Sequence, residues 1–209
     1  LEAQKIEKRI SITPEVAKKY IGLGFDVNIF ENYGKHLGFE DKEYLDFGVK
    51  IIKDEKEIIN NADIIIQLGL LNDSQVSQLK PNQTIIGTLN PYENRNKLEE
   101  IAKKKINLFS LELLPRITRA QSMDILSSQA NLAGYKAVIE SFSIFKKAIP
   151  MMMTAAGTIP AAKVLVIGAG VAGLQAIATA KRMGAIVYAT DVRIASKEQV
   201  ESLGGKFLM

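Results

Sequence analysis

The sequence predicts an α/β fold made of two Rossmann-like domains with doubly wound parallel sheets, the second of them truncated. Three observations predict it. Short apolar runs alternate with helical patterns over the first 121 residues, which is the order of elements in a parallel sheet. A long helical pattern then runs from Ser122 to Lys147. Finally, a glycine-rich turn joins an apolar run to another helical pattern at residue 168, which is typical of a nucleotide-binding βαβ unit.

These observations divide the chain into three segments. We expect an N-terminal α/β domain over residues 1–121, a linking helix over residues 122–149 and the start of a nucleotide-binding domain over residues 150–209. A complete nucleotide-binding sheet needs more residues than this last segment offers. We therefore expect the chain to be a portion of a longer protein.

The first domain begins with a clear helix signal. Thr13 is a good cap, Pro14 suits the first turn, and Glu15 lies near the positive end of the helix. Further helices are predicted at 41–47, 55–60 and 95–104, and strands at 26–30, 49–52, 63–68, 84–89 and 107–111.

The glycines of the second domain suit a loop that binds phosphate. The run 163–167 predicts a strand buried on both faces, and a helix is predicted from 174 to 183. Gly168 would let the strand turn sharply, Gly170 would leave space for a pyrophosphate, and Gly173 would let the helix pack closely. The free N–H groups at the start of the helix would favour the phosphates.

Asp191 follows a second predicted strand at 186–190. We expect its carboxylate to accept hydrogen bonds from adenosine ribose hydroxyls and to repel a 2′-phosphate, which favours NAD over NADP. Arg193 is near enough to weaken that preference. The alternative is a glycine-rich turn in an apolar core, with Asp191 at a solvated strand end.

Composition excludes several other classes. The chain is 47% hydrophobic and 24% charged, with a net charge of +4. Its lysines are interspersed with acidic residues, which indicates solvated helix faces and no nucleic-acid surface. It has no cysteine and a single histidine, His36, which we expect to be exposed. Thiol and thiolate–metal chemistry are therefore excluded. The apolar stretch 148–180 is broken by proline and glycine, so we predict no membrane-spanning helix there.

The junction of the two domains has an unusual density of polar side chains. Asp124, Ser127 and Ser128 share one face of the predicted helix. Such a face could grip a nicotinamide carboxamide and ribose. The alternative is ordinary capping, with Ser122 as the N-cap, Asp124 near the helix dipole and the serines in water.

These residues also carry a resemblance to a known family. The runs 116–124 and 126–135 closely resemble the NAD(H)-binding domain of the alpha subunit of proton-translocating NAD(P) transhydrogenases, within the alanine dehydrogenase/transhydrogenase superfamily. Residues 9–15, 154–158, 168–182, 190–193 and 198–207 agree with the same pattern.

The resemblance implies a role for each site residue. Arg116, Gln121 and Asp124 are the implied catalytic residues, acting by positioning, with Ser127 beside them at the nicotinamide end of NAD(H). Arg116 also helps to seat the nucleotide against a partner domain. The residues implied to hold the pyrophosphate are Gly168, Gly170, Val171 and Gly173, and those implied to line the adenosine ribose are Asp191, Val192 and Arg193.

The implied reaction is reversible hydride transfer between NAD(H) on this domain and NADP(H) on a partner domain, coupled to proton movement through a membrane domain. Hydride passes directly between the nicotinamide rings, so catalysis needs positioning and no side-chain base. The resemblance further implies a homodimer, for which the long helix is a plausible interface, and a peripheral place on an inner or plasma membrane for a segment that is itself soluble. No metal and no nucleic acid are implied.

One departure from the family pattern and two alternatives accompany this interpretation. Residues 1–8 do not resemble the first strand of the family, and we expect this chain alone to bind NAD weakly and to transfer nothing. Alanine dehydrogenases use a lysine and a histidine after strands that correspond to 64–69 and 85–90, where this chain has neither. An alanine dehydrogenase-like enzyme and a non-catalytic NAD-binding module remain as the alternatives.

Overall fold

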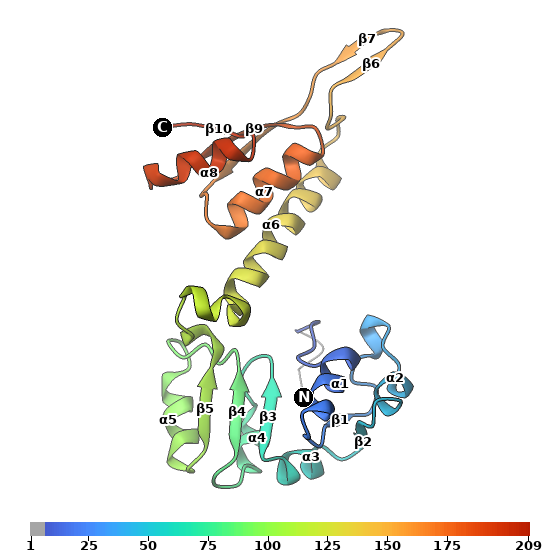
Figure 1. Cartoon of the computed structure of the whole chain (residues 1–209), viewed down its shortest axis with the longest axis vertical. Coiled ribbons are helices and arrows are strands. Elements are labelled where there is room, and N and C mark those ends of the chain that lie inside the picture. Colours follow the sequence, from blue (N-terminus) through green and yellow to red (C-terminus); the bar gives the residue numbers. More distant parts are fainter. Residues whose placement is uncertain (1–6) are drawn as a thin grey trace. The chain divides into compact units, whose positions relative to one another are not determined.

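The computed structural model describes residues 7–209, which form two compact units with their boundary between Met123 and Asp124 (Figure 1). We expected residues 1–8 to differ from the first strand of the family. Positions 1–6 lie outside the described residues, and Glu7 and Lys8 form no strand.

The first unit alternates short strands and helices. All five predicted strands are present, each one or two residues shorter than predicted. The strands are β1 (Asn28–Phe30), β2 (Lys50–Ile52), β3 (Ile64–Gln67), β4 (Thr84–Gly87) and β5 (Asn107–Ser110). The α-helices are α1 (Pro14–Gly22), α2 (Asp41–Leu45), α3 (Glu55–Asn61), α4 (Asp73–Ser77) and α5 (Arg95–Lys103), and the 3-10 helices are η1 (Lys35–Leu37), η2 (Leu111–Leu113) and η3 (Thr118–Met123). The sequence prediction missed α4.

Every strand pair of this unit is parallel, as predicted, but the described strands form two sheets and not one. The first sheet pairs β1 with β2, and the second has the order β3–β4–β5, seen side by side in Figure 1. Each sheet has its own buried cluster: Ile59, Ile65, Ile85 and Ile101 belong to the one around β3–β5. The other cluster surrounds β1 and includes Tyr44.

The predicted N-cap of the first helix is confirmed. The Thr13 hydroxyl accepts a hydrogen bond from the Val16 N–H at 3.4 Å, and Pro14 begins α1. The lysine run at 103–105 ends α5, where the negative end of the helix dipole favours cations.

The second unit surrounds the glycine turn. Its elements are α6 (Ile125–Ile144), β6 (Met152–Thr154), β7 (Gly157–Ile159), β8 (Lys163–Ile167), α7 (Val171–Arg182), β9 (Ile186–Thr190), η4 (Ile194–Ser196), α8 (Lys197–Ser202) and β10 (Lys206–Phe207). The parallel sheet has the order β10–β9–β8, so it has three strands where we expected two. The long helix α6 belongs to this unit and packs against α7, whereas we expected a separate linking segment.

Close helix packing in this unit depends on one glycine. A Cβ built on Gly134 of α6 would lie 2.1 Å from the Ala172 carbonyl oxygen at the start of α7. Real Cβ atoms essentially never approach so closely. The absence of a side chain at Gly134 therefore sets how close the two helices lie.

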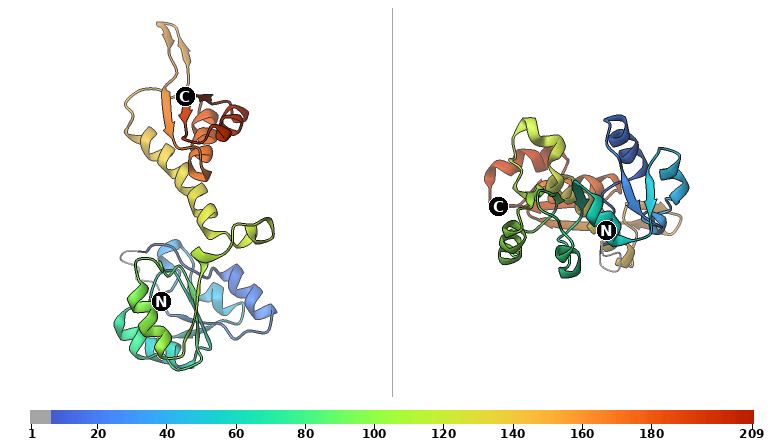
Figure 2. Two further views of the ribbon diagram at one scale, coloured as in Figure 1. Left: turned by 90° about the vertical axis from the view of Figure 1, so that its left-hand side faces the viewer. Right: turned by 90° about the horizontal axis from the view of Figure 1, so that it is seen from below.

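A hairpin between α6 and β8 was not predicted. Strands β6 and β7 pair antiparallel and project from the unit, as both Figure 1 and the left view of Figure 2 show. Thr154 holds the turn, because its hydroxyl accepts from the Ala156 N–H at 3.2 Å and donates to the Gly157 carbonyl at 2.8 Å. The segment Met151–Met153, which leads into this hairpin and forms part of it, is exposed.

The prediction that the strand at 163–167 is buried on both faces is wrong for the described residues. Val164 and Val166 of β8 pack toward the core with α7, whereas Leu165 and Ile167 are 56% and 81% exposed. The reason is that α7 covers one face of this sheet and the opposite face is open. Within residues 7–209, none of the helices combines the length and the apolar character that crossing a membrane requires.

Candidate functional site

The glycine turn connects β8 to α7 as the sequence predicts. Gly168 directly follows β8 and has φ +95°, a conformation that suits glycine. Gly170 is the N-cap of α7, and the first helical hydrogen bond runs from the Leu174 N–H to the Gly170 carbonyl. The N–H groups of the first helical turn therefore point out of the start of a twelve-residue helix, which is the backbone arrangement that binds anions.

Two glycines of this turn meet different surroundings. A Cβ on Gly173 would lie 1.8 Å from the Gly168 carbonyl oxygen, so close packing excludes any side chain there. A Cβ on Gly170 would enter open space, with no heavy atom within 4 Å. The space over Gly170 is therefore free for a ligand group, which fits the expected place of a pyrophosphate.

Asp191 lies directly after β9, at the carboxyl end of the sheet beside the glycine turn. Its Oδ2 accepts from the Ala169 N–H at 2.7 Å, and its Oδ1 accepts from the Arg193 N–H at 2.8 Å. The Arg193 guanidinium donates to both oxygens, from Nε at 2.9 Å and from Nη2 at 3.0 Å. The structure thus brings Asp191, Arg193 and the loop together, and sequence reasoning missed the pairing of the two side chains.

The pairing of Arg193 with Asp191 determines the protonation state of both side chains. The Arg193 side chain, followed by the Arg193 and Ala169 N–H groups, holds the pKa of Asp191 far below its ordinary value. Asp191 is correspondingly ionised at neutral pH, and the ion pair raises the pKa of Arg193. Val192 between them is fully exposed.

The start of α6 is capped by Asp124 and not by Ser122. The Asp124 carboxylate accepts the Ser127 N–H at 2.9 Å and the Ser127 hydroxyl at 2.6 Å. The Ser128 hydroxyl donates instead to the Ile125 carbonyl at 3.1 Å. Asp124 and Ser127 are therefore together, as the shared helix face predicts, and the alternative in which Ser122 is the N-cap is wrong.

The other two junction residues belong to the first unit. Gln121 lies on η3 and Arg116 lies in the segment between η2 and η3. Both are exposed. Their side chains are accessible from solvent, but they are not in the same compact unit as Asp124 and the glycine turn.

The strand ends of the first unit carry no basic side chain at the positions compared with alanine dehydrogenases. Gln67 ends β3 and is buried, with its Nε2 donating to the Gly69 carbonyl at 3.0 Å. Asn90 follows β4, and its N–H donates to Glu112 at 2.7 Å.

His36 is exposed, as predicted, and its Nε2 lies 2.8 Å from the Lys8 carbonyl oxygen. Across residues 7–209, no group of three His, Asp or Glu side chains could share a metal ion.

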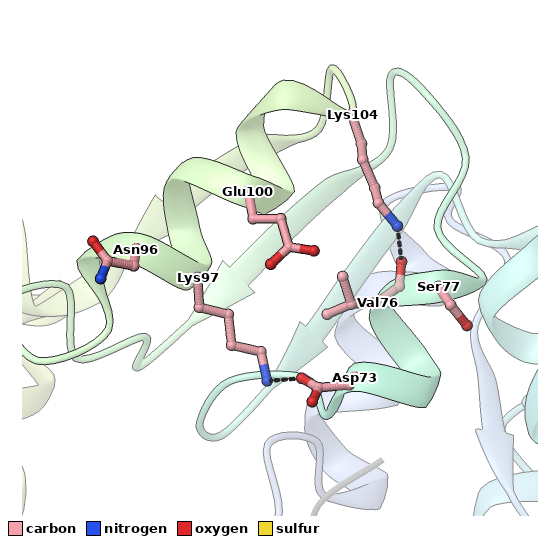
Figure 3. A pocket seen from close by; sticks show the side chains of 7 residues that line it. All are labelled: Asp73, Val76, Ser77, Asn96, Lys97, Glu100 and Lys104. Atoms are coloured by element: carbon pink, nitrogen blue, oxygen red, sulfur yellow. Dashed lines mark hydrogen bonds and ion pairs between the residues drawn. The ribbon is translucent and has the colours of Figure 1, made fainter.

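The first unit has a hollow between α4 and α5, drawn in Figure 3. Lys97 donates to Asp73 at 2.7 Å, and Lys104 donates to the Val76 carbonyl at 2.9 Å. These contacts join the two helices of the first unit. The glycine turn and Asp191 belong to the other unit.

Fold and site together define an α/β protein with a Rossmann-like βαβ unit, in which a glycine turn, a helix N-terminus and a strand-end aspartate are in place. Two family models match the chain. The model described as "Alanine dehydrogenase/PNT, N-terminal domain" matches residues 1–133, and the model described as "Alanine dehydrogenase/PNT, C-terminal domain" matches residues 137–209. The chain belongs to the alanine dehydrogenase/PNT family.

Individual relatives confirm the resemblance to transhydrogenases. A Rickettsia prowazekii protein, named as the first section of NAD(P) transhydrogenase subunit alpha, is 52% identical over 211 residues, which cover 99% of this chain and 55% of the relative. The protein of the same name from Rhodospirillum rubrum is 50% identical, over 97% of this chain and 54% of the relative. The chain thus spans about half the length of these relatives.

Solved structures agree on the fold. "The crystal structure of transhydrogenase from Sinorhizobium meliloti" matches with a TM-score of 0.94 and 47% identity, over 100% of this chain and 62% of that one. An L-alanine dehydrogenase matches with a TM-score of 0.83 and 19% identity, over 99% of this chain and 58% of that one, a likeness that shows the fold alone.

Proposed function

We propose that this chain is the NAD(H)-binding portion of a proton-translocating NAD(P) transhydrogenase. The observation that carries the proposal is the open space over Gly170, which is the N-cap of α7 and follows Ala169, whose N–H donates to the ionised Asp191. The names of the relatives, which are NAD(P) transhydrogenase subunits, support the activity.

The residues present fit a dinucleotide. The turn from Gly168 to Gly173, with Val171 in the first helical turn, would hold the pyrophosphate through backbone N–H groups. Asp191, Val192 and Arg193 would line the adenosine ribose, with Asp191 as the hydrogen-bond acceptor. The negative charge of Asp191 favours NAD(H) on this chain, and NADP(H) would then bind to a partner domain.

The junction residues would act at the nicotinamide end. Bound NAD(H) supplies the hydride-carrying nicotinamide ring. We assign Gln121, Asp124, Ser127 and Arg116 to its surroundings, with positioning as their contribution. Asp124 has a second task in this assignment, because its carboxylate also caps α6.

The partners follow from the same proposal. They are an NADP-binding domain and a proton-conducting membrane domain, which would place this chain at the surface of an inner or plasma membrane. A homodimer is also proposed. Exposed apolar side chains on α6, among them Leu132, Tyr135 and Ile144, support an interface along that helix.

Hydride transfer tests the function. The chain, and a version continued with the C-terminal portion of the R. prowazekii relative, are each mixed with a transhydrogenase NADP-binding domain. Reduction of an NAD analogue by NADPH is then followed. We expect transfer by the continued version, and at least a tenfold lower rate after Gln121→Asn with NADH affinity changed less than about twofold. NADH binding without transfer favours a non-catalytic module, and alanine turnover would favour an amino-acid dehydrogenase.

A further inference from the structure

The carboxylate of Asp191 has no room for a further hydrogen-bond donor. An ionised carboxylate offers about four acceptor positions, two on each oxygen. Oδ1 accepts from the Arg193 N–H and Nε, and Oδ2 accepts from the Ala169 N–H and Arg193 Nη2. All four positions are therefore taken before any ribose arrives.

The four donors are of two kinds. The Ala169 and Arg193 N–H groups are fixed by the glycine turn and by the chain after β9. The two guanidinium donors belong to a side chain that is 63% exposed, whereas the Asp191 side chain is 6% exposed. If the guanidinium swings into solvent, one acceptor position becomes free on each carboxylate oxygen. A ribose with free 2′- and 3′-hydroxyls offers two donors that match these two positions.

We propose that the Arg193 side chain occupies the ribose-binding positions of Asp191 in the free protein, and that a nucleoside binds by displacing it. This inference rests on the proposed function, because it assumes that the ribose binds at Asp191. Arg193 is thereby a specificity-determining residue. Two hydroxyl donors replace the two guanidinium donors, whereas a 2′-phosphate brings acceptors and cannot replace them.

The exchange needs no proton. The Arg193 side chain is the largest cause of the lowered pKa of Asp191, but the Arg193 and Ala169 N–H groups also lower it and remain in place when the guanidinium leaves, so the carboxylate stays ionised at neutral pH. The penalty for ligand binding is the lost ion pair. A pair with one exposed partner is worth about as much as a two- to fivefold change in an equilibrium constant.

Adenosine tests the displacement, because it carries the ribose hydroxyls without the charged pyrophosphate. Its affinity for the whole chain is measured from shifts of the Ala169 and Gly170 amide signals in NMR spectra. The variant is Arg193→Ala, which keeps the backbone N–H. The control is Lys197→Ala, which removes an equal charge nearby, where Lys197 pairs with Glu201. NADH is titrated in parallel, and circular dichroism checks the fold.

We expect Arg193→Ala to tighten adenosine binding about two- to fivefold and Lys197→Ala to leave it unchanged. The gain should shrink for 2′-deoxyadenosine, which lacks one donor. In the unaltered chain, the Arg193 Nε–H signal should be protected from exchange and lose that protection when adenosine is added. Weaker or unchanged adenosine binding by Arg193→Ala, while NADH still binds, would overturn the displacement and leave the proposed function standing. Binding of neither NADH nor adenosine would overturn both.

Discussion

The Ala169 N–H donates a hydrogen bond to Asp191 Oδ2 at 2.7 Å, across 22 positions of sequence. This bond ties the glycine turn to the end of β9. The backbone that would hold a pyrophosphate and the carboxylate that would hold a ribose are thereby fixed to each other. The geometry of the proposed nucleotide site is built into the fold of the second unit.

Gly173→Ala should destabilise the second unit. The added Cβ would lie 1.8 Å from the Gly168 carbonyl oxygen, so the turn must move. Overpacking of this kind costs about 1–3 kcal/mol. Chemical denaturation measures the change, and stability equal to that of the unaltered chain would contradict the close contact.

Gly134→Ala should also destabilise this unit, by a similar amount of about 1–3 kcal/mol. Here the Cβ would lie 2.1 Å from the Ala172 carbonyl oxygen, so α6 and α7 must separate. Gly22→Ala, in α1, is the matched control, since a Cβ there meets nothing within 4 Å. Because alanine has a higher helix propensity than glycine, Gly22→Ala should leave the free energy of unfolding unchanged or raise it by up to about 1 kcal/mol. Equal thermal stability of the two variants would disprove the packing argument.

Asp124→Ala and Asp124→Asn separate the cap from the proposed nucleotide role. Removing the acceptor for the Ser127 N–H should cost about 0.5–2 kcal/mol, whereas asparagine caps about as well as aspartate. Asp124→Asn should therefore keep its free energy of unfolding and lose NADH affinity. A fully retained NADH affinity in this variant would leave Asp124 with the cap alone.

Glu112 gives the first unit a pH-dependent contribution to stability. Burial acts to raise its pKa, but hydrogen bonds from the Ser110 hydroxyl and from the Asn90 and Leu89 N–H groups outweigh burial and lower the pKa below 4.5. Because the pKa is lowered in the folded state, the contribution is present above about pH 4.5 and is lost as the pH falls below it.

Glu112→Gln should accordingly cost about 1 kcal/mol at pH 7 and progressively less below pH 4.5. The exposed Glu100→Gln on α5 is the control. Denaturation midpoints at pH 7 and pH 3.5 check this expectation. A difference in stability between Glu112→Gln and the unaltered chain that grows toward acid pH would contradict a lowered pKa of Glu112 in the folded state.

Local sequence patterns carry much of this fold. The βαβ unit was predictable because its strands are β-branched runs and Gly168 has the backbone conformation that only glycine adopts readily. Helix α4 also has a signal in the sequence. Asn72 and Gln75 form a reciprocal capping box, and the spacing Asn-x-x-Gln is visible in the sequence.

Other features depend on contacts that no local pattern reveals. The open face of β8 depends on what packs against Leu165 and Ile167, and burial is a tertiary property. The hairpin lacks the usual glycine-rich pair at its turn, where Thr154 supplies the hydrogen bonds. The pairing of Arg193 with Asp191 depends on the direction that the chain takes after β9, and the sequence does not show that direction.

Titration with NADH tests the central claim most directly. Nicotinamide fluorescence is followed for the unaltered chain and for Gly170→Ala, whose Cβ enters open space and so leaves the fold intact. We predict weak but saturable binding of one NADH per chain, and at least a tenfold loss of affinity in Gly170→Ala at an unchanged melting temperature. Equal NADH binding by the two proteins, or no binding by either, would contradict the assignment of the glycine turn as the nucleotide site.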